Sequence, residues 1–241
     1  MSIFLVLAFL FFVGALLGWV LELFFRKFFS AANPERKWIN PGFCTGPYIP
    51  LYGFGLCLMY LLASLDRLNI TGNPIGDKVL LFTAMAVCMT VIEYIAGVMC
   101  IKLMNVRLWD YSGEWANLDG IICPKFSLIW AALGAIYYFG VHPYILDALK
   151  WLSENLAFSF VIGMFYGVFI IDVAKSMELV VKIKKFAQDN DVIVKFEYLK
   201  AHIRSVQDKA KEKHNFFFPF HTKLSIGEHL KTMHLSERFK R

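Results

Sequence analysis

Five apolar runs dominate the pattern of hydrophobic and polar positions along this chain. They lie at residues 3–25, 50–65, 79–101, 121–141 and 156–181. A helix needs about 20 apolar residues to cross the ~30 Å hydrocarbon core of a bilayer, so the second run is short for a span. The fifth run contains Asp172 and Lys175, which we interpret as a local ion pair near the membrane boundary. The pattern predicts an all-α, polytopic integral membrane protein with about five transmembrane helices, formed by residues 1–181.

The last sixty residues follow a different pattern. Residues 182–241 hold 14 Lys and Arg against 7 Asp and Glu, although the net charge of the whole chain is only +6. Apolar residues recur there at steps of four and three, at Val192, Phe196, Leu199, Ile203 and Val206. This spacing predicts a helical, basic, amphipathic cytoplasmic tail whose apolar stripe suits a partner helix or the membrane surface. Its charges are spread along the tail without a recognition motif, so we do not expect nucleic acid binding.

The composition agrees with a membrane protein. Hydrophobic residues make up 58% of the chain, charged residues make up 18%, and the mean hydropathy is +0.53. The five cysteines form no C-x-x-C pair, so we expect small buried side chains rather than disulfides or metal ligands. We predict no metal and no cofactor. His142-Pro143, after the fourth run, predicts a loop turn.

Lys and Arg residues predict how the chain is oriented. The first and third loops carry most of them: Arg26, Lys27, Arg36 and Lys37 in the first, and Lys102 and Arg107 in the third, with Lys125 just inside the next helix. The second loop has Arg67 and Lys78, and the fourth has Lys150. Basic residues accumulate on the cytoplasmic side of a membrane. We therefore expect a multi-pass protein of the cell membrane, in the bacterial inner membrane, with the N-terminus outside and the C-terminus in the cytoplasm.

One spacing occurs twice in the membrane part. Each copy has a Glu, a Trp sixteen positions later, then a Gly and, four positions further on, a Pro that begins an apolar run. The residues are Glu22, Trp38, Gly46 and Pro50 in the first copy, and Glu93, Trp109, Gly120 and Pro124 in the second. This internal repeat predicts two helix–loop–helix units, at about residues 10–65 and 79–141, of a kind common in transporters. The predicted orientation makes the two units parallel.

Several short motifs resemble a known family. In the first copy they are Gly18-Trp19 with Glu22, the run 40–43, the run 46–50 and Tyr52-Gly53; in the second they are Glu93, the run 109–112, Asn117, Gly120 and Trp130. Together they resemble the CmpB-like family of type IV ABC-transporter membrane proteins over about residues 10–140. The chain departs from the family pattern at Pro41 and Pro124. The resemblance implies a transport role and names no substrate.

Glu22 and Glu93 are acids within apolar runs. A carboxylate in hydrocarbon costs several kcal/mol, so such residues usually face a cavity or a partner. Glu93 has no basic residue within one turn, and we predict that it binds a ligand. Glu22 has Arg26 four positions later, so a ligand site and a local ion pair both remain open. If the repeat brings the two acids together, they would share a proton or a cation.

The first loop contains three prolines and three glycines between residues 37 and 53, which excludes a continuous helix. Its backbone either dips to membrane depth and lines a wet cavity, or forms a tight interfacial turn with Pro50 starting the next helix. We select Asn40 and Tyr52 here as candidate ligand-binding residues.

The third loop is rich in groups that bind polar ligands. Asp110, Asn117 and Asp119 offer carboxylate and amide oxygens, and Arg107 could bind an anion. Trp109 completes this set of candidates. The alternative is ordinary structural chemistry, with Trp109 in the aromatic belt and Asn117 or Asp119 capping the next helix.

These features predict a permease-like transport protein with a polar, carboxylate-containing cavity open to the cytoplasm and an unknown substrate. The chain has no P-loop motif, so an ABC role would require a separate ATPase subunit on the cytoplasmic face. The expected partners are the lipid bilayer, that ATPase and a second copy of the chain. The alternatives are an intramembrane enzyme that acts on a lipid headgroup or lipid-linked substrate at the cytoplasmic leaflet, and a non-catalytic scaffold. We predict no catalytic residues, and the sequence leaves open whether the chain is an enzyme.

Overall fold

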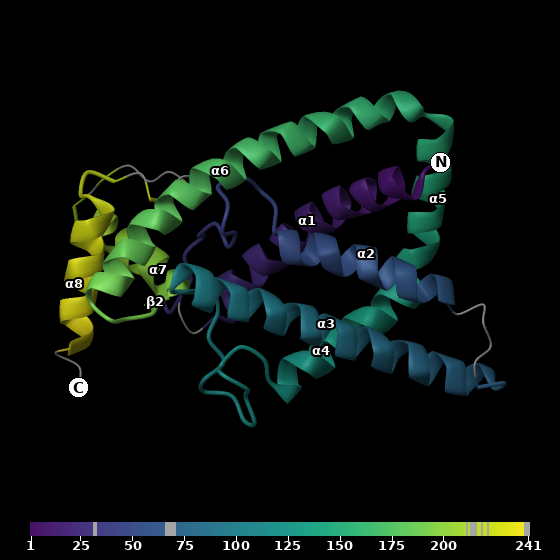
Figure 1. Cartoon of the computed structure of the whole chain (residues 1–241), viewed down its shortest axis with the longest axis horizontal. Helices are drawn as coiled ribbons and strands as arrows, with labels where there is room; N and C mark the ends of the chain where they lie inside the picture. The colour runs from purple at the N-terminus through teal and green to yellow at the C-terminus, as the bar shows by residue number, and fades with distance from the viewer. Residues whose placement is uncertain are drawn as a thin grey trace. The chain divides into compact units, whose positions relative to one another are not determined.

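The computed structural model describes residues 1–30, 33–65, 71–210, 212, 216–217, 219–220 and 222–238, with the backbone alone from residue 234. Its helices are α1 (Ile3–Phe28), α2 (Pro50–Ser64), α3 (Pro74–Met104), α4 (Pro124–Ile136), α5 (His142–Glu154), α6 (Ser159–Asp189), α7 (Phe196–Lys209) and α8 (Ile226–Arg238) (Figure 1). Two short strands, β1 (Val106–Arg107) and β2 (Val194–Lys195), pair in parallel. The predicted all-α class is confirmed.

Among the described residues, four helical stretches are long and apolar enough to cross a membrane. They are Ile3–Phe28, Pro74–Met104, Pro124–Glu154 and Leu156–Asp189. The second predicted run forms α2, a shorter apolar helix of 15 residues. The chain is therefore a polytopic membrane protein, as predicted. Its orientation stays a prediction, and Arg67, which contributed to that prediction, lies outside the described residues.

Two helices begin at the prolines of the repeated spacing. Pro50 is the first residue of α2, and Pro124 is the first residue of α4, where Cys123 before it is extended. Proline suits this position because its fixed φ matches that of a helix. It lacks an N–H, but the N–H groups of the first turn have no acceptor within the helix.

The predicted loop turn at His142-Pro143 is wrong. After α4 the chain forms a π-helical turn, η2 (Tyr137–Val141), and continues directly into α5. The N–H of His142 bonds to the carbonyl oxygen of Tyr137, and the Tyr137 hydroxyl lies 2.8 Å from His142 Nδ1. Pro143 falls in the first turn of α5, where a missing N–H is tolerated. A π-helical turn is wider than an α-helical turn, which lets the chain stay helical up to Pro143, although a proline usually ends a helix.

The described chain divides into two compact units. The first comprises Met1–Leu16, Pro50–Ala96 and Tyr111–Val168. Its core is apolar and includes the fully buried Leu10 of α1, Met85 of α3 and Leu152 of α5. Helices that are distant in the sequence thus pack together in this unit.

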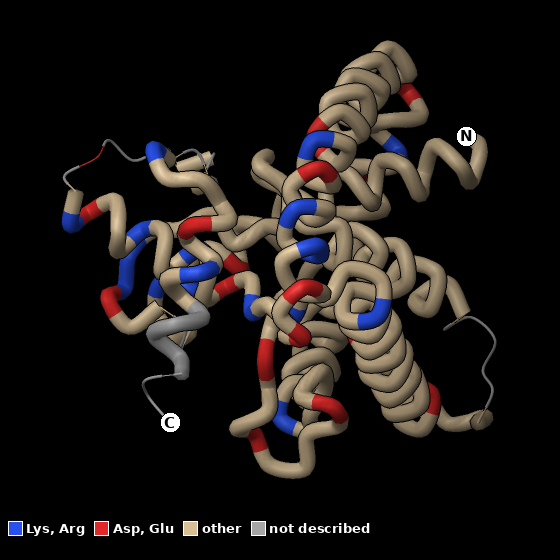
Figure 2. Tube along the Cα trace, turned by 60° about the vertical axis from the view of Figure 1, so that its left-hand side comes forward, with Lys and Arg blue, Asp and Glu red and all other residues tan. Residues whose placement is uncertain are grey.

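The second unit comprises Leu17–Ile49, Gly97–Asp110 and Phe169–Arg241. Its core joins the predicted tail to the third loop through the buried Val106, Ile183, Leu199 and Ile203, and Phe43 of the first loop packs against it. The apolar stripe of α7 is therefore buried inside the chain's own unit, not on a partner helix or the membrane surface. In Figure 2, Lys, Arg, Asp and Glu are frequent along the part of the chain near the C-terminus and sparser along the apolar helix at the N-terminus.

Candidate functional site

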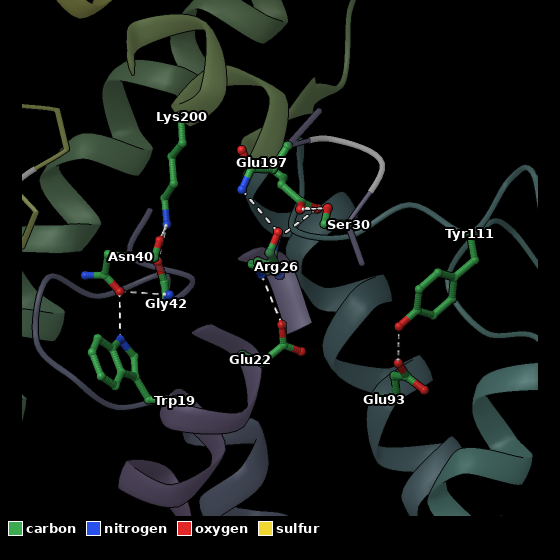
Figure 3. A network of polar contacts seen from close by, with 11 residues as sticks. Trp19, Glu22, Arg26, Ser30, Asn40, Gly42, Glu93, Tyr111, Glu197 and Lys200 are labelled. Atoms are coloured by element: carbon green, nitrogen blue, oxygen red, sulfur yellow. Dashed lines mark hydrogen bonds and ion pairs between the residues drawn. The ribbon is translucent and has the colours of Figure 1, made fainter. Parts of the chain in front are cut away.

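A lysine of the tail helix lies inside the second unit. Lys200 lies on α7 three positions before Ile203, and it is only 4% exposed. Its Nζ donates a hydrogen bond of 2.9 Å to the carbonyl oxygen of Asn40 and another to that of Gly42 (Figure 3). Burial, with a smaller contribution from the charge of Arg26, lowers the pKa of Lys200 to about 7.

Asn40, a predicted ligand-binding residue, holds the first loop in shape. Its Oδ1 accepts hydrogen bonds from Trp19 Nε1 at 2.8 Å and from the backbone N–H of Gly42 at 3.1 Å. Its Nδ2 donates to the carbonyl oxygens of Thr45 at 2.8 Å and Cys44 at 3.4 Å. The buried amide thus uses both its acceptor and its donor capacity within the unit. In this conformation Asn40 positions the loop and the carbonyl oxygen that Lys200 binds.

Asp172 of α6 holds the same loop from another helix. Its carboxylate accepts backbone N–H bonds from Thr45 at 3.2 Å and Gly46 at 2.7 Å, and hydroxyl bonds from Thr45 and Tyr48. Among the described residues no ion pair joins Asp172 to the exposed Lys175, so the predicted local pair is wrong. A buried carboxylate needs several donors, and the loop backbone supplies them more completely than one mobile lysine.

Arg26, near the end of α1, lies between two carboxylates. Its Nε is 3.1 Å from Glu22 Oε2, and its Nη1 is 2.9 Å from Glu197 Oε2 on α7 (Figure 3). Ser30 also donates a hydrogen bond to Glu197. The local pair of Glu22 and Arg26, one of the two predicted alternatives, is therefore present. The sequence did not indicate that a tail carboxylate would share the guanidinium.

Glu93 belongs to the first unit and is 3% exposed. Tyr111 donates its hydroxyl to Oε1 at 3.0 Å, and Trp130 donates Nε1–H to Oε2 at 3.0 Å. The ring of Tyr52 lies 5.6 Å from that of Trp130 between centroids. The structure thus brings two predicted residues, Glu93 and Tyr52, to the same tryptophan. Each carboxylate oxygen of this buried acid therefore accepts a hydrogen bond from a neutral donor.

Asp110 of the third loop pairs with two basic residues, one from the loop and one from the tail. In the second unit, Arg107 Nη1 is 3.0 Å from Asp110 Oδ1, and Lys195 Nζ is 2.8 Å from Asp110 Oδ2. Because β1 pairs with β2, Arg107 and Lys195 are held side by side. Trp109 directly precedes Asp110 in the sequence and is half-buried. Asp110 therefore links the third loop to the tail.

Asn117 and Asp119 lie in the first unit. Asn117 donates to the carbonyl oxygen of Glu114 at 2.9 Å and accepts the N–H of Gly120 at 3.0 Å. Asp119 accepts the Tyr94 hydroxyl at 2.9 Å. These bonds shape the turn that precedes α4, and neither side chain caps the helix, whose N-cap residue is Cys123.

The nine predicted site residues divide between the units. Glu22, Asn40, Arg107, Trp109 and Asp110 belong to the second unit, and Tyr52, Glu93, Asn117 and Asp119 belong to the first. Glu22 and Glu93 each have partners in their own unit, and a site shared by both stays a prediction.

A comparison with protein families gives a match over residues 9–177, to the family described as "Putative ABC-transporter type IV". The chain belongs to this family. The match includes all nine predicted site residues and Asp172, and it ends before α7. A search of curated proteins and a search of solved structures each gave no match.

Two contacts in this ABC-transporter family member were not predicted from its sequence: the contacts of Lys200 with the first loop, and those of Asp172 with the same loop. A signal for Lys200 was present, because a lysine four positions after Phe196 and three before Ile203 borders the apolar face of α7. For Asp172 the signal was its place in an apolar run, but the sequence did not indicate that its donors come from a loop more than 120 positions away.

Cys44 of the first loop is in surroundings that make its thiol a weak nucleophile. Burial, followed by the charge of Asp172, raises the pKa of the Cys44 thiol to about 12. A thiol with such a pKa stays protonated at neutral pH and is a poor nucleophile. Within the part of the chain that the structure describes, no group of three or more His, Cys, Asp or Glu side chains is placed to hold a metal ion.

Proposed function

We propose that the protein is the membrane-spanning component of a transporter and that its second unit transmits the movement of a separate ATPase subunit to α1 and α6. The family supports a membrane component of ABC-transporter type. The chain lacks a P-loop motif, so ATP hydrolysis would belong to another subunit.

The observation that carries this proposal is the attachment of α7 to the first loop and to α1. Lys200 binds two carbonyl oxygens of the loop, and Glu197 binds Arg26 of α1. Asp172 fastens the same loop to α6. Hydrogen bonds and ion pairs between buried or partly buried groups are directional and costly to break. A force applied to α7 would therefore move the loop and the adjoining parts of both helices.

We assign substrate binding to a polar cavity, open to the cytoplasm, that includes the residues around Glu93. The support is chemical: a buried carboxylate is accompanied by the indole of Trp130 and the phenols of Tyr111 and Tyr52. Aromatic faces and a carboxylate together suit a small cationic or amphiphilic substrate. Asn117 and Asp119, in the same unit, add polar groups to the turn beyond Tyr111.

We also propose that α2 crosses the inner membrane of a bacterium as a fifth, short span, so that the C-terminus is cytoplasmic and the N-terminus external. The support is the concentration of basic residues in the first loop, the third loop and the tail. This orientation places α7 on the side where ATP is available.

The experiment uses the full-length protein, tagged at its C-terminus and expressed from its own locus. Crosslinked membranes are solubilised, the tagged protein is purified, and any P-loop ATPase is identified and reconstituted with it in lipid nanodiscs. We expect ATP hydrolysis by the reconstituted pair to exceed that of the ATPase alone. Lys200→Met should reduce this stimulation severalfold, whereas Lys231→Met, an exposed change on α8, should leave it unchanged. If the rate of ATP hydrolysis is the same with and without the membrane component, the proposal is wrong.

A further inference from the structure

The helix α5 differs in direction from the helices around it. In the first unit it follows the π-helical turn η2, and Figure 1 shows it running across the ends of α1 and α6, not alongside them. Its residues Ile145, Leu149 and Leu152 belong to the same buried cluster as Leu10 of α1 and Ile162 of α6. The inner face of α5 is therefore packed onto the end of this helix cluster.

The outer face of α5 combines aromatic and charged residues. Tyr144 is 74% exposed and Trp151 is 48% exposed, and they are seven positions apart on one side of the helix. Asp147 and Lys150 between them are also exposed. Tyr and Trp with charged neighbours are typical of the boundary between hydrocarbon and water, because the rings are apolar and their O–H and N–H groups are polar. The charged side chains of Asp147 and Lys150 would be unfavourable in the hydrocarbon core.

The length of the preceding helix also places α5 at this boundary. The 13 residues of α4 and the 5 residues of η2 form a continuous helical stretch. At a rise of 1.5 Å per residue it spans about 27 Å, which is close to the thickness of the hydrocarbon core. The stretch Leu156–Asp189 then provides the next candidate span. The chain can cross the bilayer before α5 and again after it.

We propose that α5 lies in the headgroup region of the bilayer, parallel to the membrane plane, with Tyr144 and Trp151 against phospholipid headgroups. Pro124–Glu154 is then a membrane span followed by an interfacial helix. Lys150 is positioned to reach lipid phosphates, and the inner face keeps α5 attached to the ends of the spans. This interaction is independent of whether the protein transports a substrate.

The test measures the depth of Trp151 in the full-length protein, reconstituted in nanodiscs of phosphatidylcholine. Nitroxide lipids carry the quencher either on the headgroup or near the middle of the acyl chain. The emission of Trp151 is obtained as the difference between the wild type and Trp151→Phe, a change that keeps an aromatic ring against Phe158. We expect the headgroup nitroxide to quench this difference at least about twofold more than the mid-chain nitroxide.

A matched control calibrates the depth scale. Ala132 is exposed near the middle of the stretch formed by α4 and η2, so Ala132→Trp in the Trp151→Phe protein should be quenched most by the mid-chain nitroxide. Stronger mid-chain quenching of Trp151 itself would show that α5 continues the span. Quenching of Trp151 by aqueous iodide alone would show that α5 lies off the membrane. Either result overturns the proposal.

Discussion

Lys200 donates a 2.9 Å hydrogen bond to the carbonyl oxygen of Asn40, although 160 positions separate the two residues. The donor is on the tail helix α7, and the acceptor is in the loop between α1 and α2. Asn40 is itself held by Trp19 of α1. A polar connection therefore runs from the tail through the loop to a membrane helix, all within the second unit. The position of this loop is set by the tail as well as by the helices that flank it.

Lys200→Met should loosen the first loop. The methionine keeps most of the side-chain volume but leaves the carbonyl oxygens of Asn40 and Gly42 without the ammonium donor. We expect a loss of about 1–3 kcal/mol in stability, because unsatisfied buried acceptors are costly. The measurement is thermal unfolding in detergent, with proteolysis between residues 33 and 49 as a local reporter. Lys209→Met, an exposed change at the end of α7, should alter neither.

The contribution of Lys200 to stability should depend on pH. Its pKa in the folded protein is about 7, against an ordinary value of 10.5. Between these values the unfolded chain binds a proton that the folded protein does not, so stability from this group rises with pH, by at most about 1.4 kcal/mol per pH unit. Below about pH 7 both states are protonated and the slope disappears. We expect the stability difference between wild type and Lys200→Met to change in this way from neutral to alkaline pH; a difference that falls as pH rises would contradict the assignment.

Asp172→Asn should weaken the attachment of the same loop to α6. The amide has one oxygen, and its NH₂ group would face N–H and O–H donors of Thr45, Gly46 and Tyr48. We expect destabilisation of about 1–3 kcal/mol and faster proteolysis of the loop. Asp189→Asn removes the same charge from an exposed position of α6 and serves as the control. Equal effects of the two changes would mean that charge, and not the hydrogen bonds, is responsible.

Glu93→Gln separates charge from hydrogen bonding in the first unit. A glutamine oxygen can accept the Trp130 N–H while its NH₂ group donates to the Tyr111 hydroxyl, so both contacts survive. If the carboxylate binds a proton, a cation or a cationic substrate, transport should fall by at least about tenfold, which corresponds to ~1.4 kcal/mol, while the melting temperature is retained. The measurement is ATP-dependent transport by the reconstituted protein. Trp130→Phe is the structural control and should lower the melting temperature, because it leaves one carboxylate oxygen without that donor.

The orientation can be checked with reporters. A reporter fused after Arg241 should be active in the cytoplasm, and one inserted after Gly72 in the second loop should be active outside. Alkaline phosphatase and a fluorescent protein distinguish the two compartments. The reverse pair of results would move α7 away from ATP and contradict the proposed coupling.

The sequence predicted features that depend on local chemistry. An apolar run long enough to cross a bilayer is sufficient to indicate a span, and four of the five runs form helices of that kind. Pro50 and Pro124 begin helices because of the geometry of proline itself. Glu22 and Arg26 pair because residues four apart lie on the same side of a helix. Each of these depends on neighbours within a few positions.

The tertiary structure decided the partners of the remaining groups. An apolar stripe shows that one face of α7 will be buried, but its spacing is the same whether the cover is another protein, a lipid surface or the chain's own loops. Asp172 had a lysine three positions away, yet its carboxylate turned to a loop whose N–H and O–H groups meet it only after the chain has folded. Local rules describe what a side chain needs, and the folded chain determines which distant group supplies it. That is why the spans could be predicted from the sequence, whereas the connection from Lys200 to Asn40 could not.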